Sequence, residues 1–173
     1  ENIARHHQRG KLTARERIEL IADEHSFHET RSLVGQSTYD GDTQTAFLPK
    51  GSVEGTVKID GRKVMVVAGD FTVRGGSGGT SSRGALGSEL SATERAIEWR
   101  MPYVRLLDAA GGSVRGFEVL GRTYLPDGNS YGQHDVKLLQ TAPVVSAVLG
   151  SVAGLPAVEA PLSHFSVMVK DIS

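Results

Sequence analysis

The chain has 173 residues, of which 39% are hydrophobic and 23% charged, and its formal net charge is -1. This length suits one domain with a substantial core, and the near-neutral charge argues against nucleic acid as a partner. The sequence contains no cysteine, which excludes disulfides and thiolate metal sites, and no apolar run approaches the roughly 20 residues of a membrane helix. The first residues lack a signal-peptide pattern, so we expect a cytoplasmic protein without membrane attachment.

A short helix is expected near the start of the chain. Thr13 and Glu16 have the spacing of a capping box, in which each side chain satisfies a free backbone amide at a helix N-terminus. The helix should run to about residue 23. Its buried side is predicted to contain Ile18, Leu20 and Ile21.

A β-hairpin should follow from Gly51. The runs VEGTVKI and RKVMVVAG flank Asp60-Gly61, a pair suited to the positive φ angles of a type I′ turn. The second arm is continuously apolar between Val64 and Ala68, which is typical of a strand covered on both faces.

Strands and helices then alternate along the chain. We expect a helical segment at 84–100, a strand at 103–107, a turn-rich stretch at 126–129, a short helix at 135–140, a strand at 143–150, and a last strand at FSVMVK. This alternation predicts a layered α/β fold with parallel strands joined by right-handed crossovers.

Two small-residue turns attract attention because each follows a predicted buried strand. Gly111-Gly112 follows the first, and Ala153-Gly154 follows the next. Parallel strands would bring both turns to one edge of the sheet, where backbone amides can converge on an oxygen anion. The alternative is that these glycines only permit tight turns, and spacing alone does not decide between the two.

The residues also carry a family resemblance. RHHQRGKLTARERIELIADEHSFHE, GDFTVRGGSGG, LLDAAGGSVRG, VVSAVLGSVAGLPA and FSVMVK resemble, in order, segments of the carboxyltransferase β subunits of biotin-dependent acyl-CoA carboxylases, the acetyl- and propionyl-CoA carboxylase family. The resemblance implies part of an N-terminal carboxyltransferase domain with a crotonase-like α/β fold. Residues 1–25 would be its N-terminal helical segment and residues 51–173 its crotonase-like core.

The implied activity is transfer of a carboxyl group from carboxybiotin to the α-carbon of acetyl-CoA or propionyl-CoA through an enolate. The oxyanion would be held by backbone amides of Gly111, Gly112, Ser113, Ala153 and Gly154. Possible CoA contacts are Arg74, Gly75, Gly76, Arg83 and Arg115, although the arginines suit a solvated surface equally well. One glycine turn would alternatively serve the ureido oxygen of biotin.

Several departures from the family pattern bear on the site. Ala109-Ala110 stand where relatives carry a serine, so the register of the donating amide is open by one or two positions. A frequent second glycine is replaced by Leu155, and Thr80-Ser81-Ser82 replace a charged cluster, which leaves the choice of acyl chain open.

The resemblance further implies partners. A biotin carboxylase and a biotin carrier would be separate proteins or domains, because no biotin-attachment motif surrounds Lys170. Relatives have a second crotonase-like domain and share active sites between subunits. We therefore expect a homo-oligomer in the complete protein, and an inactive isolated chain with an exposed apolar surface.

Other interpretations remain at this point. A related acyl-CoA hydratase or isomerase, or a non-catalytic acyl-CoA-binding or assembly module, would also fit. His6-His7 is interpreted as an exposed polar pair, since no third ligand has metal-site spacing. We interpret His134-Asp135 as a polar cluster at a helix N-terminus and prefer this interpretation to that of a general-base pair.

Overall fold

The computed structural model describes residues 2–77, 90–112, 118, 121 and 133–173. Its helices are α1 (Asn2–Gln8), α2 (Ala14–Ile21), α3 (Ala92–Glu98), α6 (Gln133–Thr141), α7 (Leu155–Glu159) and the short 3-10 helix η1 (Arg74–Gly76). Its strands are β1 (His28–Thr30), β2 (Gly35–Asp40), β3 (Thr43–Pro49), β4 (Ser52–Ile59), β5 (Arg62–Gly69), β6 (Tyr103–Ala109), β7 (Val144–Val152) and β8 (Phe165–Met168).

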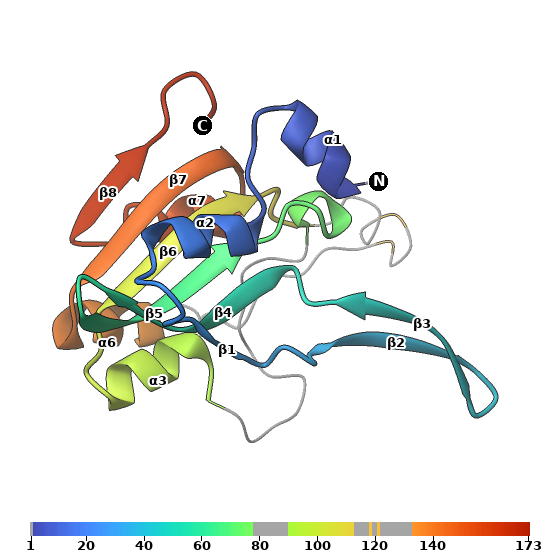
Figure 1. The fold of residues 1–173 in the computed structure, drawn as a ribbon, viewed down its shortest axis with the longest axis horizontal. Coiled ribbons are helices and arrows are strands. Elements are labelled where there is room, and N and C mark those ends of the chain that lie inside the picture. Colours follow the sequence, from blue (N-terminus) through green and yellow to red (C-terminus); the bar gives the residue numbers. More distant parts are fainter. Residues whose placement is uncertain (1, 78–89, 113–117, 119–120, 122–132) are drawn as a thin grey trace.

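A six-stranded sheet with the order β1-β4-β5-β6-β7-β8 forms the body of the molecule (Figure 1). The β1-β4 and β4-β5 pairs are antiparallel, whereas β5, β6, β7 and β8 run parallel to one another. The predicted layered α/β fold with parallel strands is therefore confirmed.

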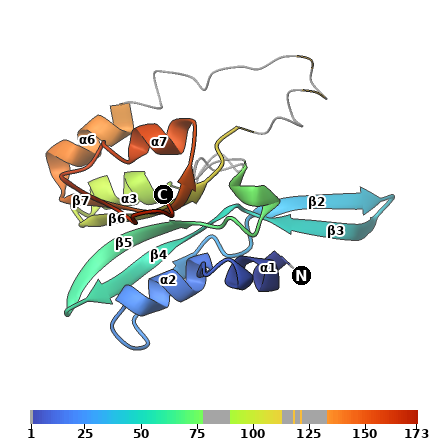
Figure 2. The same ribbon diagram turned by 90° about the horizontal axis from the view of Figure 1, so that it is seen from above.

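Helices cover both faces of this sheet, with α1 and α2 on one side and α3, α6 and α7 on the other (Figure 2). The continuous apolar run of β5 serves both layers. Met65 and Val67 pack in the cluster under α3 and α6, while Val64, Val66 and Ala68 pack in the cluster under α2. Successive side chains of a strand point to opposite faces, which explains why both halves of the run are buried.

The predicted local signals at α2 and the hairpin are confirmed. Thr13 and Glu16 form both halves of the capping box, and Asp60 and Gly61 take φ angles of 49° and 74° between β4 and β5. The prediction that Leu20 is buried is wrong, since it is 73% exposed. Arg17 occupies the buried side of α2 in its place, because its guanidinium reaches an acidic group inside the sheet.

The later elements largely match their predicted positions. Strands β6, β7 and β8 and helix α6 cover the expected segments, whereas α3 begins at Ala92 behind a second capping box of Ser91 and Glu94. The start of the predicted helical segment at 84–100 and the turn at 126–129 lie outside the described residues.

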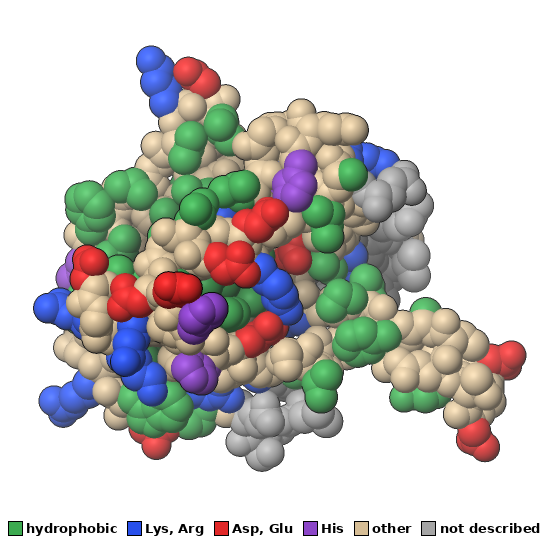
Figure 3. All heavy atoms as spheres, viewed as in Figure 1, with side chains coloured by type: hydrophobic (Ala, Val, Ile, Leu, Met, Phe, Trp, Pro, Cys, Tyr) green, Lys and Arg blue, Asp and Glu red, His purple; other side chains and the backbone are tan. Residues whose placement is uncertain are grey.

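Two regions expose apolar side chains. Strands β2 and β3 form a separate two-stranded sheet that projects from the body as an arm, which the sequence did not predict (Figures 1 and 2). At the opposite edge, the β8 residues Phe165, Val167 and Met168 are exposed, and hydrophobic side chains gather on that side of the molecule (Figure 3). The described part of the chain contains no helix long and apolar enough to cross a membrane.

Candidate functional site

The two glycine turns predicted to converge lie against each other at the carboxyl ends of β6 and β7. Gly111 and Gly154 take φ angles of 80° and 67°, a conformation that favours glycine. A Cβ atom added to Gly111 would lie 2.6 Å from the carbonyl oxygen of Ala153, and one added to Gly154 would lie 3.5 Å from the Cα of Gly111. Gly111 therefore favours glycine through both its backbone angle and its close contact, and Gly154 through its backbone angle, and the expectation that the two turns lie at one edge of the sheet is confirmed.

A third segment joins these turns from the end of β5. The amide of Ala110 donates to the carbonyl oxygen of Gly76 at 3.0 Å, and Ser77 forms a parallel bridge with Gly111. A Cβ on Gly76 would lie 2.9 Å from the Cα of Ala109, so this glycine also permits close packing of the backbone. Three consecutive strands thus deliver their following loops to one place.

The backbone amides of the two turns differ in what they bind. Ala153 donates its amide to the carbonyl oxygen of Ala109 at 3.1 Å, so this predicted donor is already engaged. The amides of Gly112 and Gly154 meet no acceptor among the described residues. Apart from chain neighbours, no described atom lies within 4 Å of the position that a Cβ on Gly112 would take. Among the described residues, open space therefore adjoins Gly112, whose amide has no acceptor there, and this arrangement suits a ligand oxygen.

Helix α7 begins directly after the second turn, with Gly154 as its N-cap residue and Pro156 in its first turn. Proline suits this position because the first helical amides have no partner inside the helix. This helix was not predicted from the sequence, and Leu155, which replaces a glycine of the family pattern, takes its first helical position.

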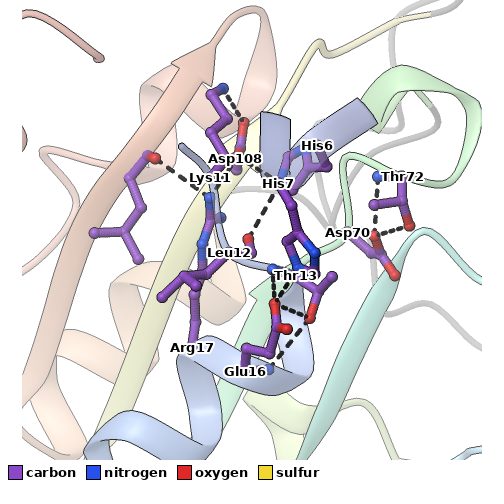
Figure 4. A network of polar contacts seen from close by, with 11 residues as sticks. His6, His7, Lys11, Leu12, Thr13, Glu16, Arg17, Asp70, Thr72 and Asp108 are labelled. Carbon is purple, nitrogen blue, oxygen red and sulfur yellow. Dashed lines mark hydrogen bonds and ion pairs between the residues drawn. The ribbon is translucent and has the colours of Figure 1, made fainter. Parts of the chain in front are cut away.

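A buried ionic cluster, which we call the Asp108 cluster, lies beside the first turn (Figure 4). The carboxylate of Asp108 is fully buried and accepts a hydrogen bond from Arg17 at 2.7 Å. Lys11 Nζ lies 3.5 Å from its other oxygen, and His6 Nε2 lies 4.0 Å away. The cluster joins the N-terminal segment to strand β6.

Neighbouring strands are shaped to hold this carboxylate. A Cβ on Gly150 of β7 would lie 2.2 Å from Asp108 Oδ1, and a Cβ on Gly69 of β5 would lie 2.8 Å from the Asp108 carbonyl oxygen. Glycines on both sides therefore make room for Asp108. The residue directly precedes Ala109, whose carbonyl oxygen binds the second turn, so the cluster fixes the start of the first turn.

Sequence reasoning did not single out this cluster. The available signal was an aspartate inside the buried run YVRLLDA, together with the basic residues of GKLTARER. A buried carboxylate needs a cationic partner, and neither run identifies the partner alone.

The remaining predicted residues have different outcomes. His6 is buried, with Nε2 3.1 Å from the carbonyl oxygen of Leu12, so the prediction that both histidines of the pair are exposed is wrong for His6. Arg74 is exposed beside Gly75, and its guanidinium donates to Gln36 Oε1 at 2.6 Å. Ser113, Arg83, Arg115, Thr80, Ser81 and Ser82 lie outside the described residues.

His134 and Asp135 occupy the first turn of α6, as predicted, and each forms its ion pair with a different side chain. Asp135 forms an ion pair with Arg105 of β6, while His134 Nε2 lies 3.8 Å from Glu94 Oε1. Burial raises the pKa of Asp135, and Arg105 offsets part of that effect. No group of three metal-ligating side chains occurs in the part of the chain that the structure describes.

The sequence model of the carboxyl transferase domain family matches residues 5–173 of this chain. The carboxyltransferase subunit of propionyl-CoA carboxylase from Haloferax mediterranei is 31% identical and spans 100% of this chain, which covers 32% of that relative. The mitochondrial propionyl-CoA carboxylase beta chain of Mus musculus is 33% identical, with 96% of this chain matched to 30% of its length. The chain thus spans about a third of these relatives.

A solved structure extends the comparison to three dimensions. The transcarboxylase 12S crystal structure, a hexamer with methylmalonyl-coenzyme A and methylmalonic acid bound, matches with a TM-score of 0.75 and 29% identity, covering 96% of this chain and 32% of its own. The fold is accordingly the crotonase-like α/β fold of carboxyltransferase domains. With the family model covering nearly all its residues, the chain belongs to the carboxyl transferase domain family.

Proposed function

We propose that this chain contributes the acyl-CoA half of a carboxyltransferase site in a biotin-dependent acyl-CoA carboxylase. The substrate would be a short acyl-CoA, acetyl-CoA or propionyl-CoA, carboxylated at its α-carbon. The single observation that carries this proposal is the contact of two glycine turns that present the amides of Gly112 and Gly154 without acceptors among the described residues.

The proposed chemistry depends on charge that develops at the thioester oxygen. Loss of the α-proton makes an enolate, whose negative oxygen is stabilised by preorganised amide donors; one such donor is worth about 3 to 4 kcal/mol. Gly112 and Gly154 are the proposed donors, with Gly111 shaping the turn and Ser113 following it. Carboxybiotin would supply the carboxyl group, and biotin left without that group would take the α-proton. Among the described residues, the open space beside Gly112 is compatible with the approach of this second substrate.

The buried environment argues against the hydratase or isomerase alternative. Such enzymes need an acidic group beside the thioester, and the carboxylate nearest along the chain to the first turn is Asp108. It is fully buried and held by Arg17 at 2.7 Å, so it is unsuited to exchange protons with a substrate. Among the described residues of the two turns, 109–112 and 150–155, none is Asp, Glu or His.

The complete enzyme would need other components. We propose a biotin carboxylase and a biotin carrier as partners, a homo-oligomeric assembly and a cytoplasmic location. The named relatives are propionyl-CoA carboxylase subunits and the transcarboxylase 12S structure is a hexamer with methylmalonyl-coenzyme A bound, which supports the choice of acyl-CoA substrate and the oligomer.

Replacing Gly112 tests the proposed donor. Gly112→Pro deletes the amide, whereas Gly112→Ala keeps it and places a methyl group in open space at a residue without positive φ. In the product of the complete open reading frame, we expect carboxylation to fall at least about tenfold in the proline variant and to stay near the parent rate in the alanine variant.

The assay would follow incorporation of carboxyl into propionyl-CoA and acetyl-CoA, with thermal unfolding as the check of folding. Parent-like turnover by a folded Gly112→Pro protein would reject Gly112 as the donor. Equal losses in both variants would show that space, rather than the amide, is what the reaction needs.

A further inference from the structure

A pocket of about 290 Å³ lies between α1 and the loop that follows β5. Three arginines line it together with other polar or small residues, and we call it the arginine pocket: Arg5, Arg9, Arg74, His6, Thr72 and Gly75. No carboxylate is among its described lining residues. The nearby Asp70 uses its Oδ1 to accept hydrogen bonds from the amide and hydroxyl of Thr72. Arg9 and Arg74 bring positive charge to this lining, which attracts anions, while Asp70 beside it keeps its negative charge.

The two walls of the pocket are tied to each other. Asn2 Nδ2 on α1 donates to the carbonyl oxygen of Thr72 at 3.2 Å. The rings of His6 and Phe71 stack with their centroids 6.2 Å apart and an angle of 21° between their planes. These contacts hold α1, which carries Arg5, against the loop that carries Arg74. Arginines from two separate segments therefore line the same pocket.

Arg74 adopts a backbone conformation that disfavours its residue type. Its φ angle is 51°, and Gly75 and Gly76 follow with 62° and 70°. A left-handed conformation at a non-glycine residue costs free energy, and such strain is concentrated at functional sites. The guanidinium donates to the neutral amide oxygen of Gln36, which leaves its positive charge uncompensated by that contact.

The same loop connects the pocket to the proposed thioester site. Gly75 lines the pocket, while the next residue, Gly76, packs against Ala109 and accepts a hydrogen bond from Ala110 at the first glycine turn. Acyl-coenzyme A carries its thioester at one end of a long flexible arm and its phosphate groups at the other. One ligand of this kind would require both an oxyanion site and a separate cationic site.

We propose that the arginine pocket binds a phosphate group of the acyl-CoA substrate, an inference that rests on the proposed function. Guanidinium groups suit this role because their planar N–H donors match phosphate oxygens. Arg74 and Arg9 are the proposed main contacts, and Thr72 adds a hydroxyl.

Glycine substitution at Arg74 offers a test that does not threaten the fold. Arg74→Gly removes the guanidinium while accepting φ 51° without strain, so stability should be unchanged or higher. Arg100→Gly is the matched control, since Arg100 is also exposed with a φ angle of 49° and lies outside the pocket. Arg9→Gln is a second variant on the opposite wall.

Binding of inorganic pyrophosphate, coenzyme A and phosphate-free pantetheine would be measured by titration calorimetry on the chain and its variants. We expect Arg74→Gly and Arg9→Gln each to weaken pyrophosphate and coenzyme A by about tenfold, and Arg100→Gly to change neither. Pantetheine binding should be the same in all four proteins.

Unchanged affinity for pyrophosphate and coenzyme A in Arg74→Gly, or an equal loss in Arg100→Gly, would overturn the proposal. Weaker pyrophosphate binding with unchanged coenzyme A binding would also overturn it, because the pocket would then serve another phosphate. The proposed function is judged separately by the Gly112 variants, whose amide acts at the other end of the substrate.

Discussion

Asp108 on β6 and Glu54 on β4 are both buried carboxylates that accept contacts from two cations outside their strands. Asp108 binds Arg17 at 2.7 Å and Lys11 at 3.5 Å, whereas Glu54 binds Lys50 at 2.6 Å and Arg31 at 3.3 Å. The local chemistry is similar, but the segments that each carboxylate holds are different.

The cations of Glu54 flank the projecting arm of β2 and β3. Arg31 precedes β2 and Lys50 follows β3, so Glu54 fastens both ends of the arm to the sheet. The cations of Asp108 come from the N-terminal segment, and Asp108 directly precedes the first glycine turn. One carboxylate therefore anchors a peripheral element and the other supports the candidate site.

The two clusters also differ in the proton chemistry of their cations. Burial lowers the pKa of Lys50 below its ordinary value of 10.5, although Glu54 acts to raise it. Arginine stays protonated throughout the accessible pH range. Lys50 can therefore lose its charge when Glu54 is removed, which offsets part of the cost, whereas Arg31 beside it and Arg17 in the other cluster stay charged.

The largest effect is expected from Asp108→Asn. It keeps the shape of the side chain but leaves the buried Arg17 without a carboxylate, which should lower the free energy of unfolding by about 3 to 5 kcal/mol. Carboxylation by the complete protein should fall as well, because Ala109 and Ala110 hold the other loops of the site. Urea unfolding and the propionyl-CoA assay measure the two effects.

A variant that loses less than about 1 kcal/mol would show that Asp108 is a minor contact. A large stability loss with full activity in the folded fraction would separate the cluster from the site.

Glu54→Gln also takes a carboxylate from the buried Arg31, but it should cost less than Asp108→Asn, about 2 kcal/mol, because Lys50 can release its proton. It should leave carboxylation by the folded protein unchanged, since Glu54 contacts the flanks of the arm. Denaturant unfolding gives the first value and the assay gives the second. Lost activity at full folding would contradict the assignment of Glu54 to the arm alone.

The pH dependence sharpens the same comparison. A lysine whose pKa is lower in the folded state binds fewer protons there than when unfolded, so stability rises with pH towards 10.5. Without Glu54 this lowering becomes stronger. The part of the Glu54→Gln deficit that comes from Lys50 should therefore shrink between pH 7 and pH 10, while the part that comes from Arg31, and the Arg17 part of the Asp108→Asn deficit, should persist because arginine keeps its charge.

The smallest effect is expected at an exposed carboxylate on the same helix as Arg17. Glu16 accepts contacts from His7 at 2.9 Å and the Thr13 amide at 2.7 Å, which lower its pKa to about 2. A lowered carboxyl pKa stabilises the fold above its ordinary value of 4.5, and the contribution is lost as pH falls towards 2.

Glu16→Gln should therefore reduce Tm slightly at pH 7, and the difference from the parent should shrink below pH 4.5. Melting curves at pH 7, 5 and 3 measure this difference. A deficit that grows with acidity would mean that another group causes it.

The sequence by itself determined the elements whose signals are local. The capping box of Thr13 and Glu16, the Asp60-Gly61 turn and the apolar run of β5 each depend on a few neighbouring residues, and each was predicted correctly. The glycine turns were also identified, because glycine directly after a buried apolar run is typical of a tight turn at the end of a strand. The family resemblance rested on segments of this kind.

Only the tertiary structure decided which distant residues meet. Arg17 and Asp108 are 91 positions apart in the sequence. Nothing in either segment indicates that Arg17, and not Leu20, would lie on the buried side of α2. The hydrogen bond from the Ala153 amide to the carbonyl oxygen of Ala109 was not predicted from the sequence either. The periodicity of polar and apolar residues predicts which positions are buried. Which side chains contact each other depends on the order of the strands in the sheet and on the space that glycines such as Gly150 leave. Those features exist only once the sheet has formed.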